Sequence, residues 1–111
     1  MIISVQYPET PIPPEGVLYN RSGSKGSVSY YSINVSTNDL GLGVEIYGGN
    51  GDCDLYVAHG YQPTIFQWDY RPYLHGNSES VSIYPAEPGE WHIMLNGWDA
   101  YSGVVLDAWK W

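Results

Sequence analysis

Apolar and polar residues alternate along most of this chain, and the alternation is the main signal of its fold. Apolar side chains at every second position indicate strands with one buried face. The clearest case is the segment 53–59, where Cys53, Leu55 and Val57 alternate with Asp54 and Tyr56. Together with turns rich in glycine, proline and asparagine, the pattern predicts about eight strands. They are expected near residues 17–19, 27–35, 42–48, 53–59, 66–71, 81–83, 91–95 and 104–109.

Composition agrees with an all-β chain of one domain. The 111 residues include 13 Gly, 8 Pro and 11 Tyr, and no stretch has a helical period. We therefore predict a single-domain antiparallel β-sandwich, jelly-roll-like in its connections. Residues 1–15 hold Pro8, Pro11, Pro13 and Pro14 and are expected to form a proline-rich linker or N-terminal arm. Residues 16–111 form the sandwich.

Charge and cysteine content exclude several kinds of partner. The formal net charge of −8 argues against nucleic acid and against anionic membranes, since both require a basic surface. No apolar run approaches the length of a membrane span. The single cysteine excludes an intrachain disulfide and a multi-cysteine zinc site. The strand phase predicts that Cys53 is a buried, reduced thiol.

Acidic residues surround one arginine in the middle of the chain. Arg71 follows Asp69 by two positions, and Asp52, Asp54 and Glu79 lie nearby in the sequence. The simplest interpretation is a structural clamp in which Arg71 pairs with these carboxylates. The alternative is a calcium site with Asp52, Asp54 and Asp69 as oxygen ligands, although their spacing is not that of an EF-hand loop. No other cofactor is expected.

Aromatic residues exceed what a core of this size needs, with five Trp and eleven Tyr. Five of them fall at outward or loop positions and are candidate ligand-binding residues: Tyr47, Tyr56, Trp98, Tyr101 and Trp109. Flat rings on a sandwich can stack on sugar rings or pack against a fibrous protein. The alternative for each residue is ordinary cross-strand packing.

The chain shows no catalytic pattern. His59, His75 and His92 are the three histidines, and none stands in a nucleophile-elbow, zinc-protease or Cys-His arrangement. We therefore predict that the chain is not an enzyme.

Three motifs carry a resemblance to a known family: G-D-x-D-L-Y-V at 51–57, D-x-R-P-Y at 69–73 and G-N-x-E at 76–79. In this order they closely resemble the bacterial pre-peptidase C-terminal domain, which is related to the collagen-binding domains of clostridial collagenases. The resemblance covers roughly residues 16–108. It implies a secreted β-sandwich appended to proteases and other hydrolases. Many members carry two cysteines at the places of Tyr70 and Val81, so that cross-link is absent here.

The resemblance implies a non-catalytic accessory module that attaches a parent hydrolase domain to an insoluble polysaccharide or fibrous protein. In this hypothesis the five candidate aromatics contact the ligand, with Asp54 as a polar neighbour. The alternative is a structural or secretion-assisting spacer without a ligand, which is removed on maturation. A free-standing carbohydrate-binding protein is a third interpretation.

Overall fold

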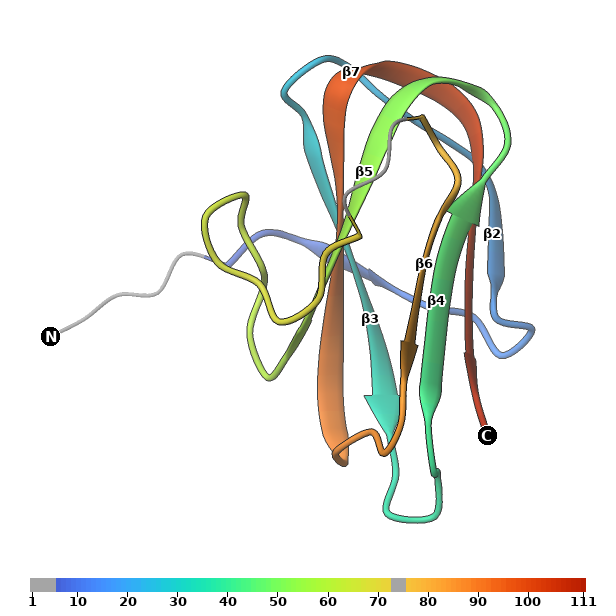
Figure 1. Ribbon diagram of the computed structural model, residues 1–111, viewed down its shortest axis with the longest axis vertical. Coiled ribbons are helices and arrows are strands. Elements are labelled where there is room, and N and C mark those ends of the chain that lie inside the picture. The colour runs from blue at the N-terminus through green and yellow to red at the C-terminus, as the bar shows by residue number, and fades with distance from the viewer. Residues whose placement is uncertain (1–5, 73–75) are drawn as a thin grey trace, which may run out of the picture.

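The computed structural model describes residues 6–72 and 76–111, and the described residues form strands, turns and loops without a helix (Figure 1). Seven strands belong to one mixed sheet that folds over on itself. They are β1 (Glu9–Pro11), β2 (Val17–Gly23), β3 (Val28–Val35), β4 (Leu42–Tyr47), β5 (Asn50–His59), β6 (Glu79–Ile83) and β7 (Gly89–Lys110). The described part of the chain therefore has no helix able to cross a membrane.

Strand β7 connects the two layers of the sandwich. Its first half pairs with β3 and β5, and its second half pairs with β2 and β4. Figure 1 shows β7 rising along one layer, arching over the end of the molecule and descending in the other. The register with β5 shifts at this arch, between the pairs Gly51–Tyr101 and Cys53–Gly97. One 22-residue strand thus serves both layers.

The main core lies between the layers. Alternate residues of β4, β5 and β7 supply it, as the sequence pattern predicts, and Cys53, Leu55 and Val57 are fully buried within it. Cys53 is a free thiol, so the prediction of a buried cysteine is confirmed. Burial and the nearby Asp54 and Glu79 carboxylates raise the pKa of this thiol to about 12.

A second buried cluster lies on the outer face of the β3–β7–β5 layer. Tyr30, Met94 and Tyr56 stand side by side on these three strands, because Met94 is paired with both tyrosines. The loop between β5 and β6 covers one side of the row with Trp68, whose ring meets Tyr56 edge-on at 5.8 Å. The N-terminal arm covers the other side, where Tyr7 stacks on Tyr30 at 5.3 Å. Both faces of this layer are therefore buried.

The N-terminal arm is attached at several points. Strand β1 runs parallel to β3, and the Ile12 N–H donates to the Ser32 carbonyl at 2.8 Å. Glu9 Oε2 lies 2.5 Å from His92 Nδ1. The Gln62 side chain accepts from the Tyr7 N–H and donates to the Tyr7 carbonyl, as a neighbouring strand would. The proline-rich arm thus packs on the β3–β7–β5 layer.

Three of the predicted strands require correction. The strands expected near 91–95 and 104–109 are parts of the continuous β7. The strand expected at 66–71 is wrong, because this segment is a loop with only the isolated bridges Val57–Tyr70 and Thr64–Gln67. The Thr64 hydroxyl accepts from the N–H groups of Phe66 and Gln67, which closes a tight turn in place of an extended run.

Candidate functional site

The outer edge of β5 is closed by side chains from the G-N-x-E motif. Asn77 Oδ1 accepts from the Cys53 N–H at 2.7 Å, and Glu79 Oε1 accepts from the Leu55 N–H at 2.7 Å. Both side chains are buried. Asn77 also donates from Nδ2 to the Gly48 carbonyl at 3.0 Å. These two residues take the place of a neighbouring strand, because alternate N–H groups of an edge strand point the same way.

The D-x-R-P-Y segment continues the same closure toward the end of β5. The Val57 N–H donates to the Tyr70 carbonyl at 2.9 Å, and the His59 N–H donates to Asp69 Oδ2 at 2.8 Å. Asp69 Oδ1 also accepts from the Tyr61 hydroxyl at 3.0 Å. Groups of the D-x-R-P-Y and G-N-x-E motifs thus accept hydrogen bonds from alternate N–H groups of β5, from Cys53 to His59. Tyr73, which ends the second motif, and His75 lie outside the described residues.

Arg71 lies over the outer face of β5. Its Nη2 is 3.6 Å from Asp54 Oδ2, and both side chains are largely buried. The guanidinium carbon lies 4.7 Å from the centre of the Tyr56 ring and 5.5 Å from that of Trp68, within the range of cation–π contact. Arg71 therefore joins an acid to two aromatic rings.

The proposed acid cluster does not form a recognisable metal centre. Asp54 and Asp69 contact different partners, and Asp52 is half-buried in the register shift of β5. In the two described ranges, no group of three or more His, Cys, Asp or Glu side chains could hold a metal ion. Calcium binding stays a prediction without a geometric site.

Two of the five candidate ligand-binding aromatics are not at the surface. Tyr56 points to the outer face as predicted, but Arg71 and Trp68 cover it and leave it 2% exposed. Tyr101 is 4% exposed because it packs in the main core at the arch of β7, and this burial raises the pKa of its hydroxyl. The expectation of exposed rings at these two positions is wrong.

The other three candidates, Tyr47, Trp98 and Trp109, are exposed. Trp98 lies at the arch of β7, whereas Tyr47 and Trp109 lie on the outer face of the β2–β7–β4–β6 layer, opposite the core-facing Ile46 and Ala108. Tyr47 pairs with Val105 and Trp109 with Gly43, so they stand four positions apart along β4.

Two further exposed rings extend this surface. Gly41 and Trp111 exchange backbone hydrogen bonds, which places Trp111 two positions beyond Trp109 on the same face. Tyr84 stacks on Trp111, with the ring centres 6.5 Å apart and an angle of 11° between the planes. We name this set, Tyr47, Tyr84, Trp109 and Trp111, the aromatic face.

Glycines place the two indoles against the sheet. A Cβ on Gly43 would lie 2.2 Å from Trp109 Cε2, and one on Gly41 would lie 2.2 Å from Trp111 Cζ2. The rings therefore occupy the space of the missing side chains. The sequence pattern predicts no role for Trp111 or Tyr84. The usable signal was the alternation of glycine at 41 and 43 with tryptophan at 109 and 111, which only strand pairing brings together.

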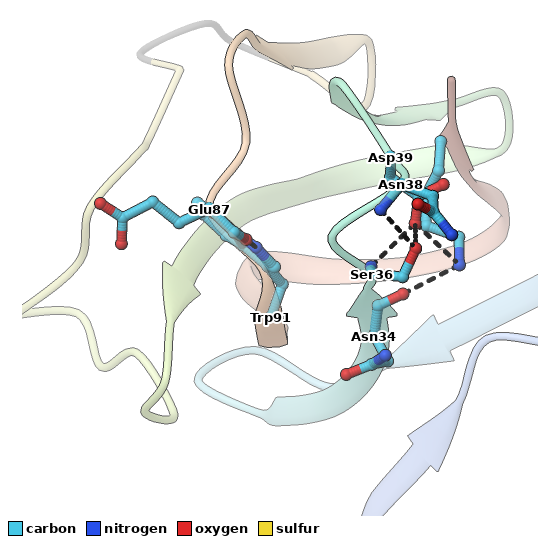
Figure 2. A network of polar contacts seen from close by, with 7 residues as sticks. Asn34, Ser36, Asn38, Asp39, Glu87 and Trp91 are labelled. Carbon is cyan, nitrogen blue, oxygen red and sulfur yellow. Dashed lines mark hydrogen bonds and ion pairs between the residues drawn. The ribbon is translucent and has the colours of Figure 1, made fainter.

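Polar contacts hold the end of β7 against the β3–β4 turn (Figure 2). The Lys110 ammonium donates to the Asn34 carbonyl at 2.9 Å and lies 3.6 Å from Asp39 Oδ2. The Ser36 N–H and hydroxyl donate to the same Asp39 oxygen, and these contacts lower the pKa of Asp39, the Ser36 N–H having the largest effect. Figure 2 also shows the Trp91 indole, which donates to the Glu87 carbonyl at 2.9 Å. Lys110 stands between Trp109 and Trp111 in the sequence, so its contacts hold the backbone that carries both indoles.

Comparison with known proteins assigns the three motifs to one family. Residues 27–97 match the model of the bacterial pre-peptidase C-terminal domain. The chain is 42% identical over 87 residues to alkaline serine exoprotease A of Vibrio alginolyticus, covering 78% of this chain and 16% of that protein. It is 47% identical over 85 residues to a zinc metalloprotease of Helicobacter pylori, covering 77% of this chain and 33% of that protein.

Two solved structures share the fold. The solution structure of vEP C-ter 100 is 40% identical, with a TM-score of 0.73, and the match covers 88% of this chain and 96% of that one. The pre-peptidase C-terminal domain of a Bacillus anthracis collagenase has a TM-score of 0.71 at 14% identity, covering 96% of this chain and all of that one.

The chain spans a third or less of the two protease relatives and is a non-catalytic domain. The extracellular setting expected from the resemblance agrees with these relatives.

Proposed function

Because the chain belongs to the bacterial pre-peptidase C-terminal domain family, we propose that it is an accessory module that holds a secreted protease on an insoluble protein substrate. The relatives named above are proteases, which favours a protein over a polysaccharide as the material bound. Polysaccharide binding by the same surface is the competing outcome, and a spacer without a ligand is the other.

The aromatic face is the observation that carries this proposal. Trp109 and Trp111 are 41% and 44% exposed, and Tyr84 is 69% exposed, although tyrosine and tryptophan gain most from burial. Exposed aromatic rings gathered on one face of a domain favour an interaction surface. The two indoles lie against glycines of the sheet and Tyr84 stacks on Trp111, so these three side chains lose little entropy when a partner covers them.

The test is retention of the purified chain on insoluble collagen, elastin, chitin and cellulose. We expect retention on at least one protein, and at least about tenfold weaker retention for Trp109→Ala, because central aromatic anchors often contribute about 2 kcal/mol or more. Trp98→Ala is the matched control, since Trp98 is equally an exposed tryptophan of β7 but lies at the arch.

Three other outcomes of the retention experiment would change the proposal. Retention on chitin or cellulose alone would replace the protein substrate by a polysaccharide. Loss with Trp98→Ala but not with Trp109→Ala would move the surface to the arch. No retention on any of the four materials would favour the spacer.

A further inference from the structure

We propose that the aromatic face takes up a lysine or arginine side chain of the bound protein between the carboxylates of Glu45 and Asp107. This inference rests on the proposed function and adds the chemistry that the substrate must present. It starts from the centre of the aromatic face, where two acids stand opposite each other.

Glu45 on β4 and Asp107 on β7 are direct cross-strand partners. Both point outward, because Val44, Ile46, Leu106 and Ala108 on either side of them are in the core. Side chains directly opposite on neighbouring strands have Cβ atoms about 5 Å apart, so like charges there repel each other. The two acids therefore stand opposite each other on the outer face of the sheet, where one cation could lie between them.

Within residues 6–72 and 76–111, neither Glu45 nor Asp107 has an ion-pair partner. Lys110 lies three positions after Asp107 but contacts Asn34 and Asp39. The chain has only four Lys and Arg residues against twelve Asp and Glu, so the missing cation is more readily supplied by a partner.

The surroundings of the pair suit the end of a basic side chain. Tyr47 lies two positions from Glu45 and Trp109 two positions from Asp107, each about 7 Å along its strand and on the same face. A hollow of about 390 Å³ on the β6 side of Glu45 is lined by Glu45, Tyr47 and Ser80, whereas Asp107 lies outside it on the β7 side. Carboxylates, a hydroxyl and aromatic rings together bind ammonium and guanidinium groups by charge-assisted hydrogen bonds and cation–π contact.

The experiment measures retention on three kinds of agarose beads. Each carries the same Gly-Ser peptide backbone, into which three lysines, three arginines or three glutamines are inserted at the same positions. The chain should be retained by the lysine and arginine beads and not by the glutamine beads, and retention should fall with added salt. The variant Glu45→Gln/Asp107→Asn should be retained at least about tenfold less. It should also melt at a higher temperature, because the repulsion is removed, so loss of binding cannot be due to unfolding.

The matched control is Glu90→Gln/Asp99→Asn, which removes the same two charges from exposed positions elsewhere on β7. It should be retained like the unaltered chain. Equal weakening of both double variants would show attraction by net charge alone and would overturn the inference, as would unchanged retention of Glu45→Gln/Asp107→Asn.

The two proposals can fail separately. If an insoluble protein retains the chain through Trp109 and the Glu45→Gln/Asp107→Asn variant is retained equally, the inference is wrong and the proposed function stands. If no insoluble polymer retains the chain, the proposed function is wrong, and the peptide beads still report whether the acidic pair binds a cation.

Discussion

The Glu79 carboxylate accepts a hydrogen bond of 2.7 Å from the Leu55 N–H, at the place where a neighbouring strand would offer a carbonyl. Asn77 does the same for Cys53. An open strand edge invites pairing with another chain, and natural sheets commonly cover or interrupt such edges. The motifs that identify the family therefore have a physical role, which is to close β5 with side chains.

Removing the Glu79 carboxylate should destabilise the fold. In Glu79→Ala the buried Leu55 N–H loses its acceptor, which typically costs about 1–3 kcal/mol. Glu79→Gln keeps an oxygen at the same place and should cost less. Urea unfolding followed by tryptophan fluorescence would measure both. An alanine variant as stable as the unaltered chain would show that water or another group satisfies the edge.

Arg71 should contribute strongly to stability, because it covers Tyr56 and lies beside Asp54 in a largely buried position. Arg71→Ala leaves Asp54 without this partner and should cost about 3 kcal/mol or more. Arg71→Lys keeps the charge but lacks the flat group that lies over two rings, so its stability should be intermediate. Thermal unfolding separates the cases, and equal stability of all three chains would contradict a structural clamp.

The Cys53 thiol gives the stability of the domain an alkaline dependence. Its pKa is raised from an ordinary 9.0 to about 12, so above pH 9 the thiol loses its proton more readily in the unfolded chain than in the fold. Stability from this group is complete below pH 9 and is lost as the pH rises toward 12. The unaltered chain should therefore lose stability between pH 9 and 12 more steeply than Cys53→Ala. Parallel curves of unfolding free energy against pH for the two chains would refute this dependence, as would rapid labelling of the native thiol at pH 8.

The contact between Gly43 and Trp109 can be tested by a double-mutant cycle. Gly43→Ala alone should destabilise the sheet or displace the indole, because the new Cβ would overlap the ring. With Trp109→Ala the space is free, and Gly43→Ala should then stabilise the strand by about 0.5–1 kcal/mol. Additive effects of the two substitutions would show that the ring does not depend on the glycine.

The period of the sequence predicts which way most side chains point but not what covers them. It places Cys53 inward and Tyr56 outward correctly, yet Tyr56 is buried because a loop returns over that face. Tyr101 is buried although an outward position is expected for it, because β7 arches there and its pairing with β5 is irregular. The role of Gly43 depends on a partner more than sixty residues away, which a reading along one strand does not reveal.

The N-terminal arm and the aromatic face lie on opposite layers of the sandwich. Strand β1 pairs with β3 and the Gln62 amide binds Tyr7 on that layer, whereas Tyr47 and Trp109 lie on the other layer. A material bound by Trp109 and Trp111 would therefore cover the layer opposite the one on which Tyr7 packs. The contacts of Tyr7 with Gln62 and Tyr30 would then stay uncovered.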